Sequence, residues 1–181
     1  MNAPAFASPE VAIPAEFQAC FAAQRAAFLK APEPTHEDRV ADLKALAHLI
    51  RDNQAAIVDA ISADYGNRSE FETLFAEVLT VLDSIHDAAK RLKGWMRPRR
   101  RRVDLLTFAG ARNRLVPQPL GVVGVIVPWN LPLMLSFSPL VSVFAGGNRA
   151  MVKMSENSRR LAERLIEISP KYFPEEKLAF F

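Results

Sequence analysis

An asparagine in a proline-rich turn is the first side chain whose type and position suggest chemistry. Asn130 lies within residues 128–132, which read PWNLP, directly after an uncharged and largely β-branched run at residues 122–127. Open α/β sheets bind ligands beyond the carboxyl ends of their strands. A neutral amide at such a place can donate an N–H to a developing oxyanion without competing as a base. Asn130 could instead cap the helix that follows, and the spacing alone leaves both roles open.

A lysine and a glutamate three residues apart form the second candidate. Lys153 ends another β-type run, at residues 150–153, and Glu156 follows near the expected start of a helix. These two side chains can hydrogen-bond the two hydroxyl groups of an adenosine ribose. They could equally form a solvated surface ion pair, which would stabilise the fold very little.

The elements that must position these residues alternate between strand and helix. Residues 122–127 suit a strand that is buried on both faces, as in a parallel sheet. Gly146 and Gly147 end the apolar helix that follows, because glycine accepts the left-handed conformation at a helix end. The order is strand 122–127, helix 131–145, strand 150–153, helix 157–168 and the opening of a third strand at 178–181. We therefore expect an α/β fold with the first half of a Rossmann-like parallel sheet (βαβα, truncated) and right-handed crossovers.

Helices and a hairpin are predicted before the sheet. Thr35 and Asp38 have the pattern of an N-cap and an acidic residue in the first turn of a helix. Residues 103–108 and 112–116, on either side of Gly110, predict a β-hairpin. The chain then divides into a flexible lead (1–14), a helical front (15–94), a basic connection with a β-hairpin (95–118) and part of a nucleotide-binding domain (119–181). That last part looks truncated, because such a sheet normally has more strands.

One segment, residues 70–93, repeats its apolar residues with a period of 3.5. Such a stripe fits the seam of a coiled coil or a long helix packed on a globular core. We favour the packed helix, because the charges that would flank a zipper seam are sparse. The stripe consists of Phe71, Leu74, Val78, Val81, Ile85, Ala88 and Leu92.

The remaining candidates for nucleophile or metal ligand are few. Cys20 is the single cysteine, which excludes a disulfide scaffold and suits a reducing, cytoplasmic environment. It lies in a predicted helix far from the residues above, so we interpret it as a small core residue and not as a catalyst. His36, His48 and His86 are scattered on helices without the spacing of metal ligands, so we expect no metal site.

Composition and charge exclude several classes of protein. Half the residues are hydrophobic and the formal net charge is only +3, which is typical of a globular chain and not of a disordered one. Arg97 and residues 99–102 could contact nucleic acid, but no RNA-binding pattern surrounds them. We favour a solvated connection that leads into the hairpin. Residues 115–148 carry no charge, yet repeated prolines argue against a membrane span.

Four blocks resemble the aldehyde dehydrogenase superfamily in their order and spacing. They are residues 119–126 (PLGVVGVI), 128–132 (PWNLP), 145–148 (AGGN) and 152–156 (VKMSE). The resemblance covers roughly residues 15–181. Residues 108–112 (FAGAR) and the run KMSENS are most similar to the coniferyl aldehyde dehydrogenase branch. The departures are Leu131 for an aromatic residue, Met154 for proline and Gly146 for alanine, and none of them removes a functional group.

The resemblance implies a reaction and a set of roles. The family oxidises aldehydes to acids: a cysteine thiolate attacks the carbonyl, hydride passes to NAD(P), and a glutamate-activated water hydrolyses the thioester. By this resemblance Asn130 is the side-chain oxyanion donor, and Lys153 and Glu156 hold the adenosine ribose. A carboxylate at Glu156 should disfavour a 2′-phosphate, so NAD is expected over NADP. The residues implied to line the cofactor cleft are Val127, Pro128 and Trp129.

The resemblance also implies what these residues lack. The family's glycine-rich nicotinamide loop, general-base glutamate and nucleophilic cysteine all lie downstream of the position that matches Phe181. We therefore predict the N-terminal portion of an NAD-dependent aldehyde dehydrogenase that is inactive alone. Its expected partners are an aldehyde and, through the hairpin, further copies of the full-length enzyme; nucleic acid and membrane are not expected. Two rival hypotheses are a non-catalytic module that pairs through the heptad-like helix and a basic RNA-associated protein that uses the arginine run.

Overall fold

The structure is a computed structural model that describes residues 13–181. The predicted flexible lead, residues 1–14, lies outside the described residues except for its last two. The helices are α1 (Ala15–Lys30), α2 (His36–Asp52), α3 (Gln54–Asp64), α4 (Glu70–Glu72), the π-helix η1 (Thr73–Leu79), α5 (Thr80–Trp95), α6 (Pro132–Ala145), α7 (Arg159–Ile168) and the short 3₁₀ turns η2 (Glu156–Ser158) and η3 (Ser169–Lys171). The strands are β1 (Arg99–Arg101), β2 (Asn113–Leu115), β3 (Val122–Ile126), β4 (Arg149–Lys153) and β5 (Leu178–Phe180).

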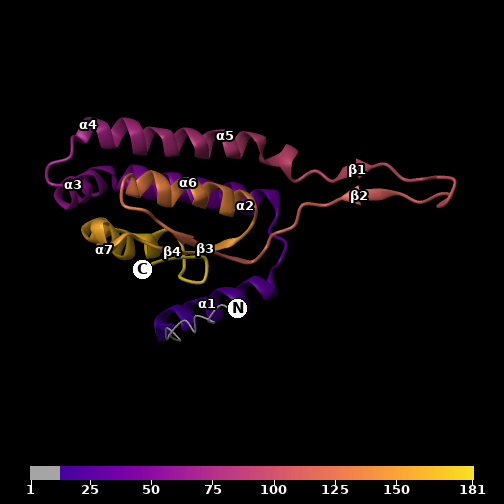
Figure 1. The fold of residues 1–181 in the computed structure, drawn as a ribbon, viewed down its shortest axis with the longest axis horizontal. Helices are drawn as coiled ribbons and strands as arrows, with labels where there is room; N and C mark the ends of the chain where they lie inside the picture. The colour runs from indigo at the N-terminus through magenta and orange to yellow at the C-terminus, as the bar shows by residue number, and fades with distance from the viewer. Residues whose placement is uncertain (1–12) are drawn as a thin grey trace, which may run out of the picture.

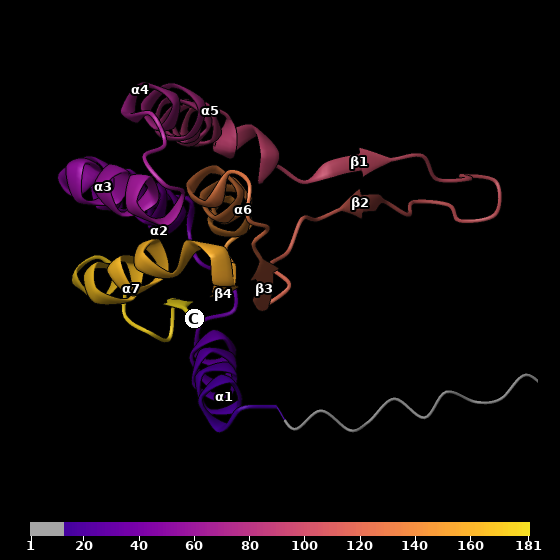
Figure 2. The same ribbon diagram turned by 60° about the vertical axis from the view of Figure 1, so that its left-hand side comes forward.

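A three-stranded parallel sheet carries the predicted βαβαβ order. Its strand order is β3-β4-β5, and Ile126 pairs with Lys153 while Val152 pairs with Phe180. Because the order does not reverse, the two crossover helices α6 and α7 lie on the same face, and α1 lies on the other (Figure 2). The predicted α/β fold is confirmed, with every strand that we expected in this region.

The burial expected for the first strand of this sheet is only partly observed. We expected residues 122–127 to be buried on both faces, but β3 lies at the edge of the described sheet. Gly124 is exposed and Ile126 is 86% exposed, whereas Val125 and Val127 are buried. An uncharged β-branched run predicts that a strand is apolar. It does not predict whether the strand lies at the edge or in the middle of the sheet, because that depends on the other strands.

The helical front forms layers above the sheet. Helices α2 and α6 lie between the sheet and the rod formed by α4, η1 and α5 (Figure 1). Thr35 and Asp38 form the predicted N-terminal cap of α2, in which each side chain accepts a hydrogen bond from the other residue's backbone N–H. The core between these layers is built from large aliphatic and aromatic side chains, among them Leu46, Phe137 and Leu140.

The predicted packing of residues 70–93 as a long helix on a globular core is confirmed, but part of the apolar stripe is not buried. Val78, Val81 and the later members of the stripe are buried against α2 and α6, so this helix packs on the chain's own core. Phe71, however, is 75% exposed. The π-helical turn holds more residues than an α-helical turn and rotates the buried face, so that Thr73 and Glu77 are buried instead.

Helix α1 closes the opposite face of the sheet. The Nε2 group of Gln24, a fully buried side chain, donates to the carbonyl oxygens of Ala150 and Glu175, each at 2.9 Å. Near the start of α1 the ring of Phe17 stacks on that of Phe181, with centroids 4.1 Å apart. These contacts fix the helix across the ends of β4 and β5.

The hairpin forms, but with a different first strand from the one predicted. Residues 103–108 are not a strand; β1 is Arg99–Arg101, which pairs antiparallel with Asn113–Leu115 and projects away from the layers (Figure 1). The side chain of Asp104 accepts hydrogen bonds from the N–H of Leu106 and the hydroxyl of Thr107, which bends the chain into a turn. Arg99–Arg101 thus form a strand of the hairpin itself, whereas Arg97 lies in the exposed connection that leads into it.

Within residues 13–181, no helix combines the length and the apolar character that crossing a bilayer would require.

Candidate functional site

The loops that follow β3 and β4 lie side by side. The N–H of Val127 donates to the carbonyl oxygen of Lys153 at 3.0 Å, so the parallel ladder continues up to the point where both loops begin. Val127 is buried, whereas Pro128, Trp129 and Asn130 are exposed beyond the end of β3. The structure therefore brings the two groups of sequence-predicted residues to the same edge of the sheet.

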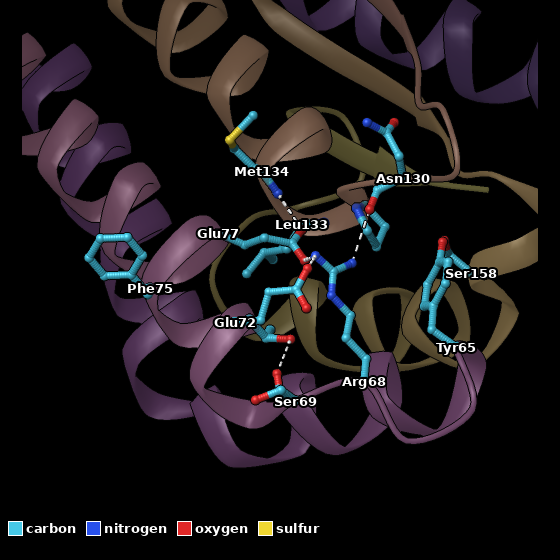
Figure 3. Close-up of polar contacts among 12 residues, drawn as sticks. Tyr65, Arg68, Ser69, Glu72, Phe75, Glu77, Asn130, Leu133, Met134 and Ser158 are labelled. Carbon is cyan, nitrogen blue, oxygen red and sulfur yellow. Dashed lines mark hydrogen bonds and ion pairs between the residues drawn. The ribbon is translucent and has the colours of Figure 1, made fainter.

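The side chain of Asn130 does not cap the following helix. The residue at the N-cap position of α6 is Leu131, and no side chain of that residue or of Asn130 makes the capping hydrogen bond within the part of the chain described. Figure 3 shows the Asn130 amide pointing away from Arg68 and Glu77. This amide is exposed and keeps its N–H groups available to a ligand.

The backbone of this loop, in contrast, is held by side chains from the helical front. Arg68 donates from Nη1 to the carbonyl oxygen of Asn130 at 3.0 Å. The hydroxyl of Tyr65 donates to the carbonyl oxygen of Trp129 and lies 2.6 Å from the hydroxyl of Ser158. Tyr65 and Arg68 flank the bend between α3 and α4, where Gly66 and Asn67 adopt positive φ angles of 67° and 73°. This bend turns both side chains toward the loop (Figure 3).

Glu77 supplies the cap that Asn130 does not. One oxygen of its carboxylate, Oε2, accepts from the N–H groups of Leu133 at 2.8 Å and Met134 at 3.1 Å, in the first turn of α6. The other oxygen, Oε1, lies 3.4 Å from Nη2 of Arg68. The Glu77 side chain is fully buried, and this burial raises the pKa of its carboxyl, while the N–H of Met134 and the charge of Arg68 act in the opposite direction.

The occupied helix terminus constrains how a nucleotide could bind. In many dinucleotide-binding folds, a glycine-rich turn leaves the N-terminus of the first crossover helix free for a pyrophosphate. Here that turn reads PWNLP, and the carboxylate of Glu77 already accepts from the N–H groups of Leu133 and Met134. A phosphate at this terminus would compete with the Glu77 carboxylate for these N–H groups, so the N-terminus of α6 is poorly suited to hold one.

The side chains of the two candidate residues in the second loop contact each other. Lys153 and Glu156 form an ion pair with each other, and their side chains are 40% and 83% exposed. The hydrogen bond from Lys153 lowers the pKa of the Glu156 carboxyl. Both residues border an open groove of about 600 Å³ whose other walls are mostly apolar, including Phe17, Val125 and Phe181. The surface ion pair is thus observed, and contact with a ribose stays a prediction.

Sequence reasoning missed the residues that hold the first loop: Tyr65, Arg68 and Glu77. A signal for Glu77 was present, because it lies four residues after Thr73 and four before Val81 and so shares a helix face with the apolar stripe. A charged residue inside a buried face needs a partner. The identity of that partner, Arg68, depends on the bend at Gly66 and on the π-helical turn.

The interpretation of Cys20 as a small core residue is confirmed. Cys20 is buried in α1, and burial raises the pKa of its thiol, which disfavours the reactive thiolate. Across residues 13–181, no cluster of His, Cys, Asp and Glu is suited to hold a metal ion.

Comparison with known proteins gives consistent matches. The model of a family described as the aldehyde dehydrogenase family matches residues 3–179. The chain is 49% identical over 164 residues to the probable coniferyl aldehyde dehydrogenase of Pseudomonas aeruginosa, a match that covers 91% of this chain and 34% of that protein. It is 42% identical over 142 residues to the coniferyl aldehyde dehydrogenase of a Pseudomonas species, covering 78% of this chain and 29% of that protein.

A solved structure agrees with the sequence matches. The substrate-bound state of the AldH protein of Staphylococcus aureus superposes with a TM-score of 0.85 at 26% identity, covering 91% of this chain and 36% of that one. The chain spans about a third of the length of the curated relatives it matches.

Proposed function

This chain belongs to the aldehyde dehydrogenase family, and on that premise we propose that it supplies the oxyanion donor and part of the cofactor site of an enzyme that oxidises an aldehyde to an acid. The observation that carries the proposal is the exposed amide of Asn130 on a fixed backbone at the carboxyl end of β3. The likeness to coniferyl aldehyde dehydrogenases supports an aromatic aldehyde such as coniferaldehyde as substrate.

The role of Asn130 follows from the charge that develops in such a reaction. When a nucleophile adds to an aldehyde, the carbonyl oxygen gains negative charge. An amide N–H already pointed at that oxygen stabilises the charge without reorganising, and one such donor commonly contributes about 10² to 10³ in rate. Asn130 cannot remove a proton, so it can act only as this donor.

The residues after β4 fit the adenosine part of a dinucleotide. The groove beside them is mostly apolar, which suits an adenine ring, and Lys153 and Glu156 present a donor and an acceptor at its rim. We propose that they hydrogen-bond the ribose hydroxyls. To do so, Lys153 and Glu156 would either break their ion pair or keep it while each also binds a hydroxyl group. When bound, NAD would accept the hydride. The carboxylate of Glu156 would repel a 2′-phosphate, which supports NAD over NADP.

These 181 residues are not proposed to complete the reaction by themselves. The reaction needs a thiolate to form the adduct that releases hydride, and a base to activate water. Cys20 is buried under the sheet in α1, and its burial disfavours the thiolate. We propose that the nucleophile and the base belong to the part of the family's enzymes that this chain does not match.

Two further proposals concern the surroundings of the enzyme. We propose that the projecting β1–β2 hairpin joins copies of the full-length enzyme, because its strands are exposed. We also propose a cytoplasmic location.

A chimeric enzyme tests the proposed function. In it, this chain replaces the matching third of the Pseudomonas aeruginosa relative, and NADH formation is followed with coniferaldehyde. We expect turnover, and a loss of kcat of about 10² to 10³ on Asn130→Ala. The control is Gln54→Ala, which removes an exposed amide at the start of α3. Equal kcat values for Asn130→Ala and the parent chimera, in an assay limited by chemistry, would contradict the assigned role.

A further inference from the structure

We propose that Glu77 and Arg68 are positioning residues for Asn130: their pair fixes the backbone that directly follows its side chain, from the Asn130 carbonyl group to the first turn of α6, and so sets the direction of its amide. The proposal rests on the proposed function of Asn130 as oxyanion donor.

The contacts made by Arg68 and Glu77 fall close together in the sequence. Arg68 binds the carbonyl oxygen of Asn130 itself, and Glu77 binds the N–H groups of Leu133 and Met134. Between these two attachments lie only Leu131 and Pro132. Arg68 Nη2 donates to Glu72 Oε1 at 3.0 Å and lies 3.4 Å from Glu77 Oε1, so these three charged side chains form one connected unit that clamps the loop and the start of α6 (Figure 3).

This clamp leaves the Asn130 side chain free. Every contact made by Arg68 and Glu77 to this segment goes to a backbone atom. The amide therefore keeps its hydrogen-bonding capacity while the atoms that orient it are held. A donor that must meet a developing charge within about 0.5 Å needs this kind of support.

Stability does not readily account for the presence of the Arg68–Glu77 pair. Glu77 Oε1 and Arg68 Nε are buried and make no hydrogen bond with any of residues 13–181, so the pair is not fully compensated. Burying such charges costs free energy that their attraction does not always return, and an apolar pair of similar volume can be at least as stable. Stability alone therefore explains this pair poorly, whereas the geometry of the loop explains both of its contacts.

The contact of Glu77 with the first turn of α6 arises from the local shape of its helix. Glu77 lies within the π-helix η1, whose wider turn directs it inward to α6. Such turns are frequently found at functional sites. The Phe75 side chain, on the neighbouring surface of the same turn, is 62% exposed and points away from the pair (Figure 3).

A double-mutant cycle in the chimeric enzyme tests the proposal. Glu77→Gln keeps the shape of the side chain and removes its charge. We expect it to lower kcat about 10-fold, since small displacements of a catalytic group can cost up to about 10², while KM for the aldehyde changes little. In the Asn130→Ala background the same substitution should leave kcat unchanged within about 2-fold, because there is no donor left to misplace.

Two additional measurements separate positioning from general destabilisation. Asp87→Asn removes another carboxylate from the same helical rod, one that pairs with Arg91 of that rod, and should leave kcat unchanged. Hydrogen exchange should accelerate in Glu77→Gln for the peptide that contains Leu133 and Met134, but not for residues 153–158. If Glu77→Gln is not recovered folded, Arg68→Lys, which keeps the charge and loses the planar fork, takes its place in the cycle.

The outcomes distinguish this proposal from the proposed function. An equal loss of kcat from Glu77→Gln with and without Asn130 would overturn the positioning role, as would an unchanged kcat in Glu77→Gln alone. If Asn130→Ala itself costs nothing, the oxyanion role fails, and the exchange data still show whether the clamp orders the loop.

Discussion

The two loops at the carboxyl edge of the sheet are neighbours that the protein supports in different ways. The loop after β3 is bound by Tyr65, Arg68 and Glu77, all from the helical front and far away in the sequence. The loop after β4 presents Lys153 and Glu156, which bind mainly each other and remain largely in solvent. A group that must stabilise a transient charge needs a fixed direction, whereas a group that binds a ligand can adjust while the ligand arrives. The helical front also contacts the second loop, through Tyr65 at Ser158, but it contributes no charged pair to that loop's two candidate residues.

The largest expected effect is the complete absence of aldehyde oxidation when the two loops are present without the rest of the enzyme. We expect no NADH from the purified 181-residue chain with NAD and coniferaldehyde, because neither loop carries a nucleophile. Absorbance of NADH is the measurement, and a Cys20→Ala sample is the control. Turnover that disappears in Cys20→Ala would make that buried thiol a nucleophile and would remove the distinction between the loops.

Stability measurements should separate the loops next. Arg68→Met leaves Glu77 as an unpaired buried charge, so we expect a loss of about 3 kcal/mol in the free energy of unfolding. Lys153→Met removes a solvated partner and should change it little or not at all. Urea unfolding followed by circular dichroism gives both values. Equal losses would mean that the two ion pairs are equivalent and that the first loop has no special support.

Cofactor titration addresses the second loop alone. In the chimeric enzyme, Glu156→Gln should weaken NAD binding and narrow the preference for NAD over NADP by several fold, since the carboxylate that repels a 2′-phosphate is gone. Glu163→Gln, which alters an exposed ion pair on α7, serves as the matched variant. Identical shifts for NAD and NADP would show that Glu156 does not sense the 2′ position.

The smallest expected effect concerns how the contributions of Glu77 and Glu156 to the free energy of unfolding change with pH, since the two should change in opposite directions. Burial raises the pKa of Glu77 above its ordinary value of 4.5, so its contribution to stability is present below that value and is lost as pH rises through the raised pKa. The hydrogen bond from Lys153 lowers the pKa of Glu156, so its contribution is present above the ordinary value and is lost as pH falls.

Unfolding of the parent chain, Glu77→Gln and Glu156→Gln from pH 3 to 8 would reveal these opposite trends as differences from the parent. A parallel trend for both variants would contradict the contrast between a buried and a solvated carboxylate.

The sequence predicted the elements better than the contacts between them. Residues 150–153 and 178–181 form the expected strands because their apolar runs and the turns around them are local features. The first hairpin strand was misplaced, because the side-chain hydrogen bonds of Asp104 stop a run that looks β-like. The edge position of β3 was also not predictable, since it is a property of the whole sheet.

For the candidate site, the sequence identified the groups that face solvent and missed those that support them. Asn130, Lys153 and Glu156 stand in recognisable positions after strands. Arg68 and Glu77 were not singled out, because the backbone groups they bind lie at distant positions of the chain. Only the three-dimensional arrangement of η1 against α6 shows what the buried carboxylate of Glu77 binds.

The π-helical turn has a consequence for how sequences of this kind can be compared. A π-helical turn holds one residue more than an α-helical turn over about the same rotation, so removing one residue from Thr73–Leu79 would restore a regular helix and leave Glu70–Glu72 in about the same orientation relative to α5. The bend at Gly66 would keep its place, but a different residue of the turn would face α6. A gap placed here in an alignment therefore marks a relative in which the residue facing the start of α6 is shifted by one position from Glu77.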